Sequence, residues 1–136
     1  MSNLSAPQDA LPVVGVIDPD PVARSGLSTL LHGLGIDVST FDSAESYLLA
    51  TSGRHIGCLI VDLLLPGMSG LELLRRLRSA GNNVPVILLA DESDVPTAVA
   101  AMREGATDFI EKPYVDVAVL KQVQKLLHVP PRTSHA

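Results

Sequence analysis

Three features that would place a chain in a membrane or outside the cell are missing from this 136-residue sequence. Its apolar runs all fall well short of the roughly 20 residues that a bilayer span requires. The N-terminus, MSNLSAPQDALP, is polar and lacks a basic region leading into an apolar stretch, so it does not resemble a secretory signal. The single cysteine, Cys58, excludes an internal disulfide, and its apolar setting predicts a buried thiol in a reducing compartment. These absences predict a cytoplasmic protein that does not contact a membrane.

Positive charge is also scarce. Ten Lys and Arg residues stand against fifteen Asp and Glu residues, which gives a formal net charge of −5. A domain that binds the phosphate backbone of a nucleic acid generally carries an excess of positive charge. This chain is therefore not expected to bind nucleic acid by itself. Repeats and low-complexity blocks are absent as well, and the length suits one ordinary domain with a real core.

Short apolar segments alternate with segments of helical period along the chain. The predicted strands are Val13–Ile17, Asp37–Phe41, Cys58–Val61, Val84–Leu89 and Asp108–Ile110. The sequences CLIVD and VPVILLA are apolar without alternation, as is typical of parallel strands covered on both faces. Strand–helix alternation with right-handed crossovers predicts an α/β fold, a doubly wound (βα)5 domain with a parallel five-stranded sheet.

Helix signals stand between these strands. Apolar residues recur at i, i+3, i+4 and i+7, first at Leu27, Leu30, Leu31 and Leu34, then from Gly70 and from Ala98. Predicted N-caps are Asp20 before Pro21, Asp42 or Ser43, and Asp94, while the predicted helix ends are Gly35, Gly81 and Gly105. We therefore predict a flexible arm at residues 1–12, one domain at 13–128, and a tail or linker at 129–136, where two prolines stop the last helix.

Charged residues follow several of the predicted strands. Function in such sheets lies beyond the carboxyl ends of the strands, where Asp18, Asp62, Asp91 and Lys112 stand. Converging carboxylates suit Mg²⁺, and a nearby lysine suits a phosphate anion. The chemistry indicated is attack of a carboxylate on a phosphoryl group. The alternative is that each acid only caps a helix or closes a turn.

Three longer stretches resemble the receiver domain of bacterial two-component response regulators: VIDPDPVARSGLSTLL, VDLLLPGMSGLELLRRL and VPVILLADESDVPTAVAAMREGATDFIEKPY. The resemblance covers about residues 13–127, and PGMSGLELL and GATDFIEKP are specific markers in the right order. The pattern is most similar to nitrogen-fixation-type regulators, whose receivers often precede a DNA-binding helix-turn-helix domain of LuxR type. The sequence leaves open whether such a domain follows in a longer protein.

The resemblance implies a flavodoxin-like sheet of strand order 2-1-3-4-5 and a role in phosphorelay signalling rather than as an enzyme. It makes Asp62 the phosphoacceptor, served by a histidine kinase or a phosphotransfer protein. It implies that Asp18, Asp62 and the backbone carbonyl of Leu64 hold Mg²⁺, and that Lys112 contacts the phosphate. The Lys112–Pro113 peptide bond is commonly cis in this family.

Several positions depart from the family pattern. Pro19 stands where members usually carry a second acid, and Asp20 can replace it only in competition with its predicted role as an N-cap. Ala90 stands in place of a Thr or Ser that bonds the phosphoryl group. Leu64 occupies a position that is often polar, and Phe109 occupies the aromatic switch position in place of Tyr.

These departures predict weak Mg²⁺ binding and weak switching. A hydrogen bond to a charged group contributes about 1.5–3 kcal/mol. Moving a two-state domain from 1:99 to 99:1 takes about 5.5 kcal/mol. Without the hydroxyl at residue 90, much of the coupling between phosphorylation and conformation is lost.

Two interpretations stay open at this point. A phosphoryl-accepting receiver is favoured by the intact set of Asp18, Asp62 and Lys112. A phosphorylation-independent receiver that acts as a protein-interaction module is favoured by the missing acid, hydroxyl and polar residue. A flavodoxin-like cofactor enzyme is excluded, because no Gly-rich or Ser/Thr-rich phosphate loop follows the first strand.

One face is predicted to bind partners. Val95, Val99 and Tyr114 lie off the inward stripe of the fourth predicted helix or beyond the fifth strand. In the family, the face formed by the fourth helix, fifth strand and fifth helix supports dimerisation, so a homodimer through it is expected. The alternative is that these are ordinary scattered apolar surface residues.

Overall fold

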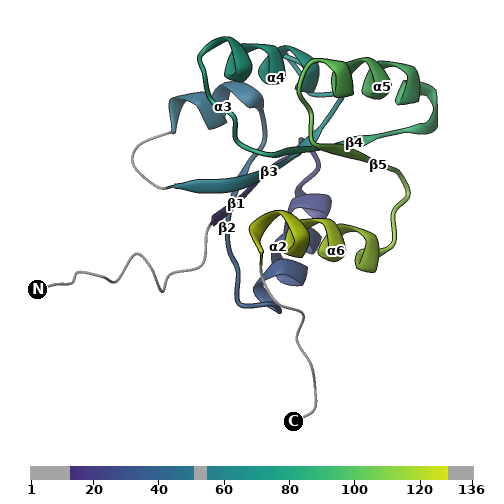
Figure 1. The fold of residues 1–136 in the computed structure, drawn as a ribbon. Coiled ribbons are helices and arrows are strands. Elements are labelled where there is room, and N and C mark those ends of the chain that lie inside the picture. The colour runs from purple at the N-terminus through teal and green to yellow at the C-terminus, as the bar shows by residue number, and fades with distance from the viewer. Residues whose placement is uncertain (1–12, 51–54, 129–136) are drawn as a thin grey trace, which may run out of the picture.

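The computed structural model describes residues 13–50 and 55–128, which form an open sheet between two layers of helices (Figure 1). The strands are β1 (Val13–Ile17), β2 (Asp37–Phe41), β3 (Ile56–Asp62), β4 (Val86–Ala90) and β5 (Asp108–Glu111). The helices are α2 (Pro21–His32), α3 (Ala44–Leu49), α4 (Gly70–Ser79), α5 (Val95–Arg103) and α6 (Asp116–Leu127), with a 3₁₀ turn η1 (Glu92–Asp94). The predicted arm (1–12) and tail (129–136) lie outside the described residues.

The sheet is parallel throughout and has the order β2-β1-β3-β4-β5. This confirms the predicted fold class and strand order. The helices α3, α4 and α5 cover one face, and α2 and α6 cover the other (Figure 1). Chain order reverses next to β1, so the carboxyl ends of β1 and β3 border the crevice where such sheets place their sites.

Both faces of the sheet are apolar, because successive strand residues point to opposite sides. In β3, Leu59 and Val61 pack toward α3, α4 and α5, while Cys58 and Ile60 pack toward α2 and α6. All four are buried. Burial on both sides explains why the central strands are continuous apolar runs rather than alternating ones.

Two strands have the predicted boundaries, and the other three differ from the prediction by one or two residues, with β5 ending at Glu111 rather than Ile110 and β4 ending at Ala90 rather than Leu89. The strands β1 and β2 have the predicted limits, whereas β4 begins at Val86 rather than Val84. Pro85 has no N–H and contributes only its carbonyl, which accepts a bond from the amide of Leu59 at 2.8 Å. The structure begins β3 at Ile56, earlier than predicted, and extends it to Asp62.

Local caps set the helix ends. Asp20 caps α2 by accepting a bond from the Val22 amide, and Ser43 rather than Asp42 caps α3. Asp94 stands at the N-cap of α5 but makes no cap bond, so the capping prediction is wrong for this residue. It lies in a 3₁₀ turn with φ −103° and ψ 4°, instead of the extended conformation that aims a side chain at the first helical amides.

Candidate functional site

Three charged side chains meet at the carboxyl edge of the sheet, as the sequence predicts. Asp18 directly follows β1, Asp62 ends β3 and Lys112 directly follows β5. The two carboxylates are the only buried charged residues among those the structure describes, with exposed fractions of 2% and 6%. Asp62 forms an ion pair with Lys112, and the charge of Lys112 acts to lower the pKa of Asp18.

Asp62 uses both carboxylate oxygens. Oδ1 accepts a bond from the Leu64 amide at 3.0 Å, and Oδ2 accepts one from Nζ of Lys112 at 2.7 Å. The first bond closes a turn just after the strand, and the second joins the ends of β3 and β5 across β4. The carboxylate is therefore fixed in orientation and has its negative charge matched by a cation.

Lys112 is positioned by its backbone. Its amide donates to the carbonyl of Ala90 at 2.8 Å, and the Lys112–Pro113 peptide bond is cis, as the family pattern implies. Partial burial acts to lower the pKa of Lys112. The hydrogen bond from Lys112 to Asp62 and the negative charges of Asp62, Asp18 and Asp91 raise the pKa by more than burial lowers it. The net result is a raised pKa. The ammonium group is therefore fully charged at neutral pH.

The side chain of Asp18 is fixed by a backbone amide two residues further along the chain. Its Oδ1 accepts a bond from the Asp20 amide at 2.9 Å. Burial raises the pKa of Asp18, the Asp20 amide opposes that rise, and the charge of Asp62 adds to it. The two carboxylates thus repel each other in a poorly solvated crevice, an arrangement that a bound cation would relieve.

The position of the missing acid is exposed. Pro19 and Asp20 both lie at the surface, and Oδ1 of Asp20 is engaged by the Val22 amide at 2.9 Å. The same side chain that would substitute for the missing acid is therefore the N-cap of α2, as predicted from the sequence.

The other departed positions occupy different environments. Ala90 is buried at the end of β4 and presents only a methyl group. Phe109 is partly buried and packs against the cluster under α3, α4 and α5. The Leu64 side chain is 57% exposed, so the apolar run after Asp62 does not continue into the core at this residue.

Sequence reasoning missed two supports of the site. Nη1 of Arg24, on α2, donates to the carbonyl of Asp18 at 2.7 Å. Glu45, on α3, accepts a bond from the Met68 amide at 2.8 Å and lies against Gly67, whose φ of +74° marks a tight turn. The sequence could have indicated only the turn, through the Pro-Gly pair at residues 66–67. The two bonds themselves join residues that are six positions apart for Arg24 and Asp18, and 23 apart for Met68 and Glu45.

The donor set for a metal is small. Among residues 13–50 and 55–128, no group of three or more His, Cys, Asp or Glu side chains is arranged to hold a metal ion. The buried acidic donors at this edge are Asp18 and Asp62, and Mg²⁺ typically combines one or two carboxylates with water and phosphate oxygens. Two buried, mutually repelling carboxylates fit that requirement.

A comparison with protein-family models gives one match, described as the response regulator receiver domain, over residues 14–124. The match takes in Asp18, Asp62 and Lys112 and most of the chain. The chain belongs to the response regulator receiver domain family. Receiver domains are signalling modules of two-component systems rather than a known catalytic family, and they typically bind Mg²⁺ at the phosphorylation site.

Several curated relatives of this receiver domain are named as transcriptional regulatory proteins. The transcriptional regulatory protein FixJ of Azorhizobium caulinodans is 42% identical over 119 residues, which cover 88% of this chain and 56% of that protein. The C4-dicarboxylate transport transcriptional regulatory protein DctD of Pseudomonas aeruginosa is also 42% identical, over 91% of this chain and 27% of that protein. The chain thus spans about half the length of the FixJ proteins, and its similarity does not separate FixJ from DctD.

Solved structures agree with the fold. Full-length FixJ from B. japonicum superposes with a TM-score of 0.82 at 35% identity, covering 88% of this chain and 59% of that one. A receiver protein from Pseudoalteromonas atlantica gives 0.79 at 37% identity, covering 86% of this chain and 98% of that one. Within the described part of the receiver domain, no helix is long and apolar enough to cross a membrane.

Proposed function

We propose that Asp62 of this receiver domain accepts a phosphoryl group from a histidine kinase or a phosphotransfer protein. The observation that supports this best is the 2.7 Å contact between Oδ2 of Asp62 and Nζ of Lys112 at the end of the central strand. A lysine so placed attracts an incoming phosphoryl group and balances the charge that it brings.

The transfer that this geometry suits is a displacement at phosphorus. A carboxylate oxygen of Asp62 attacks the phosphoryl group of a phosphohistidine, a P–O bond forms, and the P–N bond breaks with its electron pair leaving on the imidazole. Asp18, Asp62 and the Leu64 carbonyl would hold Mg²⁺, which supplies positive charge to the transferred group. Lys112 supplies the second positive charge from the protein itself.

Mass spectrometry after incubation with acetyl phosphate and Mg²⁺ tests this proposal. We expect one phosphoryl adduct on the natural chain and none on Asp62→Asn. Asp91→Asn is a matched control, because Asp91 is exposed at the same edge and should leave the adduct in place. An adduct retained in Asp62→Asn would show that another residue is the acceptor.

The departures point to a receiver that binds Mg²⁺ weakly and switches weakly. Pro19 removes one acidic ligand, and the N-cap bond of Asp20 competes with any substitution for it. The buried methyl group of Ala90 cannot bond a phosphoryl oxygen. Ala90→Thr should therefore enlarge the Mg²⁺-dependent chemical-shift changes that phosphorylation produces across Val95–Tyr114.

The alternative function is an interaction module that does not depend on phosphate. The relatives give it no support over the phosphoryl-accepting function, and the paired Asp62 and Lys112 argue against it. We further propose a FixJ-like arrangement in which a receiver at 13–128 precedes a DNA-binding output domain, the receiver itself contacting neither nucleic acid nor membrane. A cytoplasmic location is consistent with Cys58, a free thiol whose pKa burial raises to about 12.

A homodimer through α5, β5 and α6 remains a proposal with narrower support than the sequence suggested. Val99 is exposed on α5, as expected, but Val95 is only partly exposed. Tyr114 packs against the cluster under α2 and α6, so it does not offer a free aromatic ring to a partner. The exposed large apolar residues on these elements are Val99 and Met102 on α5, Val115 at the N-cap of α6 and Val117 in its first turn.

A further inference from the structure

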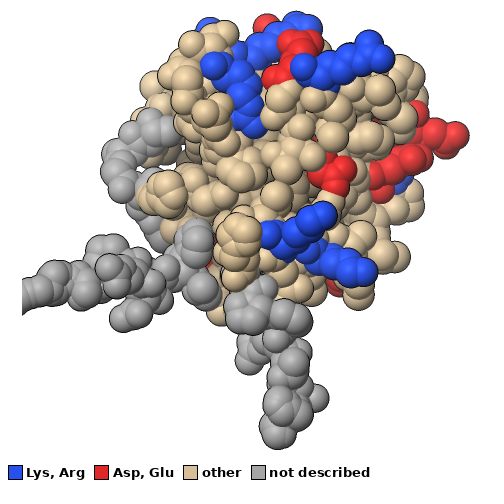
Figure 2. All heavy atoms as spheres, in the orientation of Figure 1, with Lys and Arg blue, Asp and Glu red and all other residues tan. Residues whose placement is uncertain are grey.

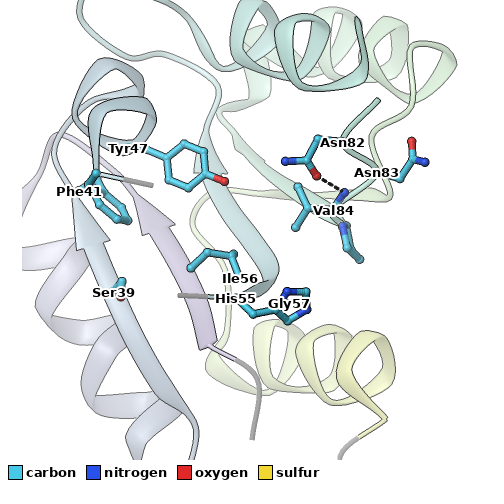
Figure 3. A pocket seen from close by; sticks show the side chains of 11 residues that line it. Ser39, Phe41, Tyr47, His55, Ile56, Gly57, Asn82, Asn83 and Val84 are labelled. Carbon is cyan, nitrogen blue, oxygen red and sulfur yellow. Dashed lines mark hydrogen bonds between the residues drawn. The ribbon is translucent and has the colours of Figure 1, made fainter. Parts of the chain in front are cut away.

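A second cavity lies on the sheet face covered by α3 and α4, near the amino ends of β3 and β4 (Figure 3). Its volume is about 540 Å³, within the range of roughly 300–1,000 Å³ that small-molecule sites occupy. Ile56 and Val84 contribute apolar walls, and Phe41 and Tyr47 contribute aromatic ones. None of these residues belongs to the candidate phosphorylation site.

Tyr47 places an unused hydrogen-bonding group in this pocket. Its side chain is 4% exposed, and its ring packs edge-on against Phe41 with centroids 5.4 Å apart. The hydroxyl points into the cavity (Figure 3), and no described residue forms a hydrogen bond with it. Burial raises the pKa of Tyr47, so the group remains a neutral O–H donor at physiological pH. The hydroxyl oxygen is not among the buried side-chain atoms that lack a partner in the described residues, so it faces solvent in the cavity. A ligand that accepts its hydrogen bond would replace water there.

Asn82 supplies a second donor across the pocket. Its Oδ1 accepts a bond from the Val84 amide at 3.0 Å, which fixes the orientation of the side-chain amide. The amide nitrogen therefore points away from Val84 and toward the side of the pocket where Tyr47 lies (Figure 3). Two donors, one hydroxyl and one amide, thus converge between apolar walls.

Charge is missing from this pocket. No Lys, Arg, Asp or Glu is among the described residues that line it. In Figure 2, the surface between the basic side chains near α4 and those near α6 is mostly uncharged, apart from an acidic group. An ionic ligand would lose its hydration here without gaining an opposite charge. A flat ring suits the aromatic walls, since aromatic pairs favour edge-to-face and offset contacts.

We infer that this pocket binds a small, neutral, planar molecule whose carbonyl-type oxygen accepts a hydrogen bond from Tyr47. The site is separate from the phosphorylation chemistry and does not depend on it. Benzamide has the required ring and acceptor, while benzoate has the same shape with a negative charge.

The test is a titration of the ¹⁵N-labelled chain with benzamide and, separately, with benzoate, followed by NMR at pH 8, where a histidine side chain is generally uncharged. We expect benzamide to shift the amide signals of Phe41, Ile56 and Val84 with saturable, millimolar affinity. Benzoate should shift them far less. Tyr47→Phe keeps the ring and removes only the hydroxyl, so it should weaken benzamide binding by about three- to tenfold.

The second tyrosine of the chain provides the matched control. Tyr114 packs against the α2 and α6 layer on the other face of the sheet, so Tyr114→Phe should leave benzamide affinity unchanged. Absence of saturable shifts around the pocket, or equal affinity in Tyr47→Phe, would overturn the inference. Tighter binding of benzoate than of benzamide would overturn the assignment to neutral ligands.

Discussion

The carboxyl edge of the sheet and the pocket under α3 differ in how their polar groups are satisfied. At the carboxyl edge, Asp62 is bonded to Lys112, and Asp18 is bonded to the Asp20 amide, although both acids are buried. In the pocket under α3, the hydroxyl of Tyr47 opens into the cavity without a hydrogen-bond partner among the described residues, and no acidic or basic side chain is among the described lining. At the carboxyl edge, the ammonium group of Lys112 can attract an anionic group. In the pocket, the Tyr47 hydroxyl and the Asn82 amide can donate hydrogen bonds between apolar walls. One sheet therefore offers two chemically distinct sites.

The largest effect is expected from removing the cation of the charged site. Lys112→Met keeps most of the aliphatic length but takes away the ammonium group 2.7 Å from Asp62. Phosphorylation by acetyl phosphate should slow by about 10²–10³-fold, the usual cost of losing one charge-stabilising donor. Lys121→Met, on the exposed part of α6, is the control. Equal rates in all three proteins would show that Lys112 is only a structural partner of Asp62.

A smaller effect is expected from restoring the missing acid. Pro19→Asp adds a third carboxylate beside Asp18 and Asp62 and should tighten Mg²⁺ binding by about tenfold, a difference of about 1.4 kcal/mol. Val22→Asp adds the same charge at an exposed neighbouring position and should change affinity much less. Titration that finds the same affinity in Pro19→Asp and the natural chain would indicate that Asp20 already serves as the ligand.

Stability should respond to the repulsion within the charged site. Because the pKa of Asp18 in the folded state lies above its ordinary 3.8, mainly through burial, its favourable contribution is fully present below that value. The contribution is lost as the pH rises through the folded pKa. Asp18→Asn should therefore unfold at higher urea concentration than the natural chain at pH 7, and this gap should close toward pH 3. A gap of equal size at pH 3 and pH 7 would show that the gain does not come from removing the charge of Asp18.

The smallest effect is expected in the uncharged pocket. Tyr47→Phe removes a hydroxyl with no described partner, so the free energy of unfolding should change by less than about 0.5 kcal/mol, and the phosphorylation rate should not change. Tyr47→Ala is the contrasting variant, since it also removes the ring that packs on Phe41 and should cost about 3–5 kcal/mol. A large loss in Tyr47→Phe would mean that the hydroxyl stabilises the domain itself.

Much of the charged site was predictable, because its members follow strands. An apolar run with residues such as CLIVD predicts a buried parallel strand, and the ends of parallel strands meet at one edge of the sheet. That rule predicts from the sequence that Asp18, Asp62 and Lys112 lie at the same edge of the sheet. It could not decide that Asp94 leaves its cap bond unmade or that Tyr114 faces the α2 and α6 layer, since both depend on the local turn geometry and on packing.

The sequence by itself determined the elements and their order: strand positions came from apolar runs, and helix ends came from side chains that bond amides a few residues away, as Asp20 does. Only the tertiary structure decided the contacts between elements. The hydrogen bond from the Met68 amide to Glu45 spans 23 residues. The cavity between Tyr47 and Asn82 is lined by residues from separate parts of the sequence, whose proximity no local pattern indicates. The physical reason is that cap bonds and hydrophobic periods connect residues only a few positions apart in the sequence. Which side chains distant in the sequence contact each other depends on how α3 and α4 pack on the twisted sheet.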